Sequence, residues 1–206
     1  TKGQVSATSE TDAISKTGNK RELPQVDLAS LAIQAGANFV ARSFSGAPKQ
    51  LIPLLQAALA FEGTAILDVI SPCITFNNHE GSFRSFPYVM EHRQELHSLD
   101  FVPHFQPLEE VDLSEGSYRD VLLHDESTLR LRAVGSEYNP HSRVGALRAI
   151  SDASKNKEHL MGLLYINTER PSLAATKNMV NIPLAHLQER DLRPSRETLQ
   201  HTLQSL

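Results

Sequence analysis

Cysteine and tryptophan are nearly absent from this sequence of 206 residues, which contains one cysteine, Cys73, and no tryptophan. A single cysteine cannot form a disulfide within the chain, and so low a cysteine content suits a protein of the reducing cytoplasm. In that compartment a lone cysteine is a buried structural thiol, a reactive thiol or a ligand for a soft metal. The composition therefore predicts a cytoplasmic location and leaves the role of Cys73 open.

Basic charge and long apolar runs are also lacking. The formal net charge is −4 at pH 7, so the positive surface of a nucleic-acid-binding protein is not expected. The most apolar segment, residues 51–61, is much shorter than the roughly 20 residues that span a bilayer. The chain has no glycine-rich phosphate loop, no Gly-x-Ser-x-Gly element and no paired-histidine zinc motif. These absences argue against nucleic-acid and membrane partners, a hydrolase triad and a zinc site.

A helix–strand–helix–strand pattern occupies the first third of the chain after a polar, irregular segment of residues 1–26. Asp27 is a good helix cap, and the run 64–70 is apolar enough for a strand buried on both faces. Alternation of this kind predicts an α/β domain with a parallel sheet, whose ligands sit beyond the carboxyl ends of the strands. The elements expected here are helices over 28–35 and 48–62 and strands over 38–42 and 64–70.

The pattern weakens beyond Cys73, although several elements are still expected. Loose periodicity suggests a helix over 83–99, and two short strands joined at residues 124–126 suggest a β-hairpin. The remaining elements expected are hairpin strands over 118–123 and 127–134, a helix over 143–153, a strand over 160–167 and a final helix from Ser195.

Two residues are candidates for chemistry. Cys73 follows the strand 64–70 in the sequence Ser-Pro-Cys, at the edge of a parallel sheet where ligands usually bind. Its thiolate would suit an iron–sulfur cluster, but one cysteine cannot hold a cluster alone. Lys2 lies in Thr-Lys-Gly-Gln, where a turn at Gly3 could bring its ammonium group against an anionic ligand. Solvated surface for Lys2 and a buried thiol for Cys73 are the simpler interpretations.

Three segments together resemble the beta subunits of 2-oxoacid:ferredoxin oxidoreductases. The first is Thr-Lys-Gly-Gln followed by Ser-Ala-Thr-Ser at residues 1–9, the second is Ala-Arg-Ser-Phe-Ser-Gly at 41–46 with Lys-Gln-Leu at 49–51, and the third is Ile-Ser-Pro-Cys-Ile-Thr-Phe-Asn at 70–77. The resemblance covers nearly all of residues 1–150 and becomes looser over 160–206. The Thr-Phe-Asn ending is closer to the 2-oxoglutarate branch than to the pyruvate branch.

The resemblance implies a cofactor set and a role for each candidate residue. The family uses thiamine diphosphate with Mg²⁺ and, in most members, a [4Fe-4S] cluster. Cys73 matches the fourth cluster ligand, Lys2 matches a lysine that contacts coenzyme A or substrate, and Thr1 would border the cofactor pocket. The implied reaction is oxidative decarboxylation of a 2-oxoacid to an acyl-CoA, with electrons passed to ferredoxin and an alpha subunit as partner.

The resemblance also implies a fold and a division of the chain. Residues 1–72 would be the carboxy-terminal part of a thiamine diphosphate-binding domain, and residues 73–206 an extension that contains the hairpin. The expected magnesium-binding and other cluster elements are missing, which suggests an inactive carboxy-terminal fragment whose sheet has an exposed edge. Ala7 replaces the usual proline, and Thr17-Gly18-Asn19 replaces another common element. A pyruvate or branched-chain enzyme and a non-catalytic α/β interaction subunit remain alternatives.

Overall fold

The computed structural model describes residues 5–11, 13–14, 18–75, 77–108, 118–134 and 138–205. The chain divides into two compact units, Thr1–Pro171 and Ser172–Leu206. The first unit has helices α1 (Leu28–Ala35), α2 (Pro48–Ala60), α3 (Phe86–His92) and α4 (Arg143–Lys155). Its strands are β1 (Phe39–Phe44), β2 (Ala65–Ile70), β3 (Arg93–Glu95), β4 (His97–Val102), β5 (Tyr118–Leu122), β6 (Thr128–Ala133) and β7 (His159–Ile166).

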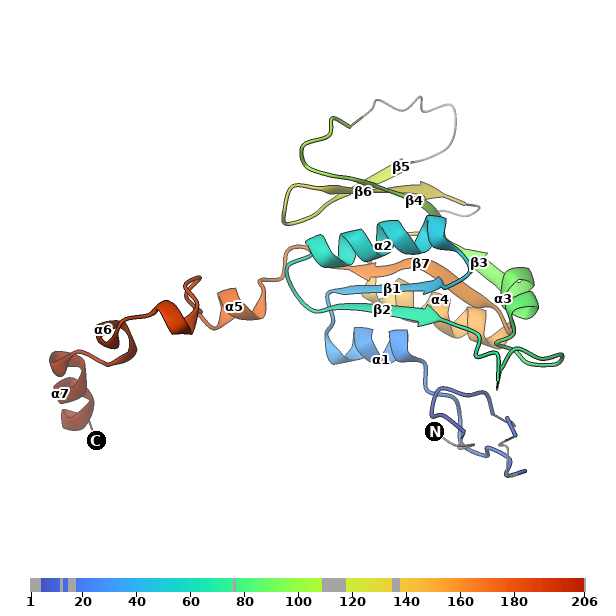
Figure 1. Cartoon of the computed structure of the whole chain (residues 1–206), viewed down its shortest axis with the longest axis horizontal. Helices are drawn as coiled ribbons and strands as arrows, with labels where there is room; N and C mark the ends of the chain where they lie inside the picture. The colour runs from blue at the N-terminus through green and yellow to red at the C-terminus, as the bar shows by residue number, and fades with distance from the viewer. Residues whose placement is uncertain are drawn as a thin grey trace. The chain divides into compact units, whose positions relative to one another are not determined.

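The strands of the first unit form two sheets (Figure 1). The larger sheet has the order β2-β1-β7-β3, in which β1 and β2 are parallel, as the sequence predicted. Strand β7 runs antiparallel to β1 and parallel to β3, so the sheet is mixed. The smaller sheet, β4-β6-β5, is antiparallel and contains the predicted hairpin as β5 and β6. The fold is therefore α/β with a parallel strand pair and a separate β-hairpin sheet.

Helices cover both faces of the larger sheet. Side chains of α1 and α4 pack on one face, where Ile33 and Ile150 meet Val40 of β1. Helix α2 packs on the other face and lies between the two sheets, so Leu54 shares one core cluster with Phe39 and with residues of β5 and β6. Alternate residues of β1 thus face opposite layers, as strand geometry requires.

Local sequence signals explain where α1 begins and ends. The carboxylate of Asp27 accepts a hydrogen bond from the backbone N–H of Ser30 at 2.7 Å, which is the cap that the sequence predicted. Gly36 ends the helix with φ of 94°, a left-handed conformation that favours glycine. The same cap places Asp27 beside the centre of the sheet, where it takes part in the site described below.

Two expectations about this unit were wrong. Residues 83–99 do not form one helix: α3 ends at His92, and the chain continues into β3, which pairs with β7, and then into β4. Strand β2 is not buried on both faces, because it is the edge strand of its sheet and alternates between partly buried and exposed residues such as Ile66. The predicted division of the chain at residues 72/73 stays a prediction.

The second unit consists of short helices: α5 (Leu173–Thr176), the 3₁₀ helix η2 (Leu184–His186), α6 (Glu189–Leu192) and α7 (Arg196–Gln204). Ser195 caps α7 by accepting a hydrogen bond from the N–H of Thr198, so the helix predicted from Ser195 is confirmed. No described residue of this unit is buried. In the described part of the whole chain, none of the helices has the length and apolar character needed to cross a membrane.

Candidate functional site

An open cleft of about 770 Å³ lies at the carboxyl ends of the parallel strands β1 and β2. Its walls come from the loop that precedes α1, from the end of β2 at residues 68–71, from the segment that leads into α3, and from the junction of α4 and β7. This is the edge of an α/β sheet at which ligands usually bind. Ser71, two residues before Cys73, lines the cleft, whereas Cys73 is not among the lining residues.

Three charged residues form the floor of the cleft. Arg42 of β1 donates from Nε to Asp68 of β2 at 2.8 Å and from a terminal nitrogen to Asp27 at 2.6 Å. Arg42 and Asp68 are register partners in the parallel pair, which explains how two residues separated by 26 positions meet. The arrangement joins β1, β2 and the start of α1 through one buried guanidinium group.

The electrostatics of this group keep Asp27 and Arg42 charged. Burial alone would raise the pKa of Asp27, but the charge of Arg42 and the hydrogen bonds from Ser30 and Arg42 outweigh it and lower that pKa. Burial alone would lower the pKa of Arg42, but Asp27 and Asp68 outweigh it and raise that pKa. Both carboxylates are engaged by the one guanidinium group, so the arrangement is suited to holding the two strands and the start of α1 together.

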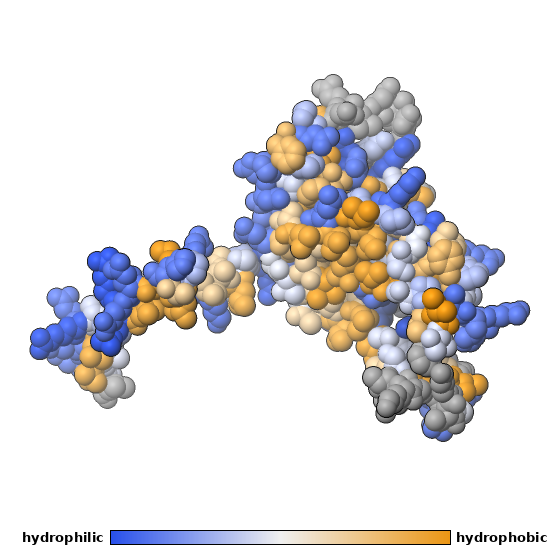
Figure 2. Space-filling model, in the orientation of Figure 1, coloured by the Kyte–Doolittle hydropathy of each residue, from blue (hydrophilic) through white to orange (hydrophobic). Residues whose placement is uncertain are grey.

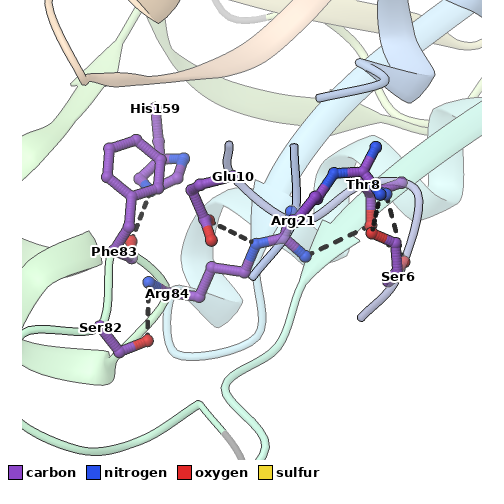
Figure 3. Close-up of polar contacts among 8 residues, drawn as sticks. All are labelled: Ser6, Thr8, Glu10, Arg21, Ser82, Phe83, Arg84 and His159. Carbon is purple, nitrogen blue, oxygen red and sulfur yellow. Dashed lines mark hydrogen bonds and ion pairs between the residues drawn. The ribbon is translucent and has the colours of Figure 1, made fainter. Parts of the chain in front are cut away.

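His159, at the start of β7, also lines the cleft and lies beside Phe83 (Figure 3). Its Nε2 lies 3.0 Å from the carbonyl oxygen of Phe83, and because a carbonyl only accepts, Nε2 carries the proton. Burial lowers the pKa of His159, which favours the neutral ring. The ring also packs against Phe83 with a centroid distance of 4.4 Å. These contacts fix the segment that leads into α3 against the sheet.

Cys73 is exposed and follows the end of β2 by three residues. Its carbonyl oxygen accepts hydrogen bonds from the N–H groups of Asn77 and Asn78 at 2.7 and 3.0 Å, so the thiol lies at the start of a turn. The alternative interpretation of Cys73 as a buried structural thiol is therefore wrong. An accessible thiol just beyond a parallel strand is able to bind a metal, although ligation itself stays a prediction.

The other two predicted site residues, Thr1 and Lys2, lie outside the described residues. Within the part of the chain that the structure describes, no group of three or more His, Cys, Asp or Glu side chains could hold a metal ion. Arg42 and Asp68 line the cleft but were not predicted from the sequence as residues of the site. Their signal was a charged residue inside each of two apolar strands, because a buried charge needs a partner.

Comparison with known proteins gives a consistent set of relatives. No family model matches the chain. A 2-oxoacid:ferredoxin oxidoreductase beta subunit of Aeropyrum pernix is 33% identical over 116 residues, which cover 52% of this chain and 32% of that protein. A beta subunit of the same description from a Sulfolobus species is 38% identical over 85 residues, covering 38% and 26%. The 2-oxoglutarate oxidoreductase subunit KorB of Mycobacterium tuberculosis is 36% identical over 84 residues, covering 40% and 22%.

A solved structure has a similar fold over almost the whole chain. It is the 2-oxoglutarate:ferredoxin oxidoreductase of Magnetococcus marinus with 2-oxoglutarate, coenzyme A and succinyl-CoA bound. The TM-score is 0.58 at 17% identity, and the match covers 94% of this chain and 54% of that one. At this level of identity the match supports the fold alone.

The fold thus resembles that of part of the 2-oxoglutarate:ferredoxin oxidoreductase chain, and the mixed sheet with helices on both faces agrees with the α/β class expected from the sequence. In sequence, the chain is similar to the beta subunits of 2-oxoacid:ferredoxin oxidoreductases, so the resemblance predicted from three motifs is confirmed. The chain spans about a third or less of the length of these curated relatives.

Proposed function

We propose that this chain works in the beta subunit of a 2-oxoacid:ferredoxin oxidoreductase, with 2-oxoglutarate as the preferred oxoacid. The reaction would convert the 2-oxoacid and coenzyme A to an acyl-CoA and carbon dioxide, and pass electrons to ferredoxin. The observation that carries the proposal is the exposed thiol of Cys73, three residues beyond β2, at the edge of a parallel sheet where ligands usually bind. The similarity to named beta subunits and to KorB supports the same reaction class and substrate.

The sequence contains one cysteine ligand for an iron–sulfur cluster, Cys73. Cys73 supplies an accessible sulfur, and thiolate is the ligand that such clusters require. Because the sequence contains one cysteine, the other ligands of a [4Fe-4S] cluster would come from outside it. Under this proposal the role of Cys73 is to complete the cluster and to hold it close to the cleft.

Thiamine diphosphate, held with Mg²⁺, would supply the carbanion-stabilising chemistry of decarboxylation when bound. In the proposal, Thr1 borders that cofactor, and Lys2 provides a positive charge for the carboxylate or phosphate groups of substrate and coenzyme A. The group of Arg42, Asp27 and Asp68 would keep the strand ends and the start of α1 in fixed relative positions. A rigid floor of this kind lowers the cost of orienting a substrate.

The test is turnover by the enzyme assembled from the alpha subunit and the beta subunit that contains this chain. Reduction of ferredoxin should depend on both a 2-oxoacid and coenzyme A, and it should be faster with 2-oxoglutarate than with pyruvate or a branched-chain 2-oxoacid. Faster turnover of pyruvate or of a branched-chain 2-oxoacid would contradict the assignment of 2-oxoglutarate, and the faster substrate would take its place. A colourless, iron-free assembly without turnover would instead favour the non-catalytic interaction subunit.

A further inference from the structure

A single guanidinium group connects two segments that are far apart in the sequence and adjacent at the cleft (Figure 3). Arg84 donates from Nε to the carboxylate of Glu10 at 3.0 Å and from a terminal nitrogen to the hydroxyl of Thr8 at 3.4 Å. The partners are separated by 74 and 76 positions, and all three residues line the cleft. The ion pair is only partly exposed, at 24% for Arg84 and 30% for Glu10, so water screens it incompletely.

The segment on the Glu10 side has its own internal connections. Arg21 donates to the carbonyl oxygens of Ser6 and Ala7, each at 3.0 Å, and to that of Pro24 at 2.8 Å. The N–H of Val26 donates to the carbonyl of Ala7 at 2.9 Å. Residues 5–11 are therefore hydrogen-bonded to residues 21–26. A contact that holds Glu10 in place also stabilises these two segments.

The segment on the Arg84 side is anchored to the sheet. The backbone N–H of Arg84 donates to the hydroxyl of Ser82, and the carbonyl of the preceding Phe83 accepts from His159 of β7. The next residue, Ser85, caps α3. Because its backbone is held on both sides, Arg84 presents its guanidinium to the loop in a preorganised position, which strengthens each hydrogen bond that it makes.

We propose that Arg84 is a positioning residue that clamps the loop of residues 5–11 in its place in the wall of the cleft. The clamp joins the loop that follows Lys2 in the sequence to the β2–α3 segment that contains Cys73. It therefore couples the loop that comes shortly after Lys2, the residue to which the proposed function assigns coenzyme A or substrate contact, to the segment that contains Cys73, to which it assigns cluster ligation. The part that concerns coenzyme A rests on that proposed function, whereas the clamp itself does not.

The test compares Arg84→Met with a matched control, Arg93→Met, in the assembled enzyme. Arg93 forms an ion pair with Glu95 of the same length, 3.0 Å, and of similar exposure, 26% and 32%, and it does not line the cleft. Amide hydrogen exchange over residues 5–11 and 21–26 should become about tenfold faster in Arg84→Met, since a charge-assisted contact is lost, and stay unchanged in Arg93→Met. Unchanged exchange in Arg84→Met would refute the clamp.

Kinetics test whether the clamp serves the reaction. Arg84→Met should raise KM for coenzyme A about fivefold or more, with kcat changed less than twofold and iron content unchanged. The exchanged pair Glu10→Arg with Arg84→Glu should restore most of the loss, because the ion pair is re-formed in the opposite direction. Equal losses in Arg84→Met and Arg93→Met, or no recovery in the exchanged pair, would contradict a positioning role.

The two proposals fail in different ways. A wild-type assembly that shows no turnover dependent on coenzyme A overturns the proposed function, while faster exchange in Arg84→Met still supports the clamp. A wild-type assembly with full turnover, whose KM and exchange are the same in Arg84→Met, overturns the clamp and leaves the function intact.

Discussion

At the scale of single residues, His97 is a buried ring that has no hydrogen-bond partner among the described residues. It begins β4, is 3% exposed, and neither ring nitrogen is hydrogen-bonded within the described part of the chain. The ring lies against Tyr138, with a centroid distance of 5.7 Å. Burial and the charge of Arg119 lower the pKa of His97 from 6.5 to about 4. The folded protein therefore holds this ring neutral under conditions in which the unfolded chain protonates it.

This difference predicts a loss of stability in mild acid. Between pH 6.5 and about 4 the unfolded state binds a proton that the folded state rejects, so stability falls as the pH falls through that window. The pKa shift of His97 can lower the free energy of unfolding by at most about 3 kcal/mol. The free energy of unfolding can be measured with urea at pH 7.5 and 5 for wild type and for His97→Leu. Between these two pH values it should fall more in wild type than in the variant. The pKa of His159 is also lowered, so His159 destabilises the fold in acid in the same way. The unfolding free energy of His97→Leu should therefore still fall between pH 7.5 and 5, but by less than that of wild type. Parallel curves would show that His97 is not the cause.

Arg42 provides a second prediction at this scale. Its guanidinium is the shared partner of Asp27 and Asp68, so Arg42→Met would leave two carboxylates facing each other across a buried site. Removing one partner of a buried ion pair typically costs about 3 kcal/mol or more. Urea unfolding at pH 7.5 should show a loss of that order for Arg42→Met. Asp68→Asn should lose less, because Arg42 keeps Asp27; a larger loss for Asp68→Asn would contradict this account.

At the scale of elements, the corner between β3 and β4 depends on a glycine of β7. Gly162 has φ of 124°, and a Cβ added there would lie 3.2 Å from Nδ1 of His97 and 3.3 Å from Cβ of Leu96. Gly81 also has positive φ, 79°, but nothing lies within 4 Å of the same added atom. A side chain at either position would strain the backbone, but only at Gly162 would it also be crowded by its neighbours.

A pair of alanine substitutions separates these effects. Gly81→Ala should cost about 1 kcal/mol, the strain of positive φ alone, and Gly162→Ala about 3 kcal/mol, because strain and crowding add. The midpoints of urea unfolding give both values. Equal costs would mean that the neighbours of Gly162 move aside freely.

Most elements of the first unit followed from local sequence signals. Capping at Asp27, the proline at residue 48 and the apolar periods of the chain predicted α1, α2, β1 and β2, and the hairpin β5–β6 was also predicted. The errors arose from tertiary structure: the helix expected over 83–99 ends at His92 because β3 pairs with β7, a distant partner. The burial of β2 was overestimated because its neighbours in the sheet cannot be read from its own sequence.

The candidate site was predictable only where a motif carried it. The Ser-Pro-Cys element placed Cys73 beyond the strand, and the structure has it exposed there. The contact between Arg84 and Glu10 could not be predicted, because both are ordinary charged residues of polar segments separated by 74 positions. Only the fold brings the loop before α1 and the segment after β2 to the same edge of the sheet.

At the scale of the whole molecule, one face of the first unit is apolar and exposed (Figure 2). Apolar side chains gather over α2, the edge strand β2 and α1; they are Leu28, Leu31, Ile52, Leu55, Leu59, Ile66 and Val69. Among the described strands, β2 pairs with β1 on one side only, so the exposed sheet edge that was expected from the sequence is present at β2. An edge strand flanked by apolar helix surfaces is typical of a site of association.

Iron analysis of Cys73→Ser in the assembled beta subunit measures whether Cys73 ligates a cluster, with Ile74→Ser as the control at the adjacent exposed position. We expect Cys73→Ser to lose most of the iron, the visible absorption of the cluster and the electron transfer to ferredoxin, while the control keeps all three. Full iron content and full ferredoxin reduction in Cys73→Ser would contradict this expectation.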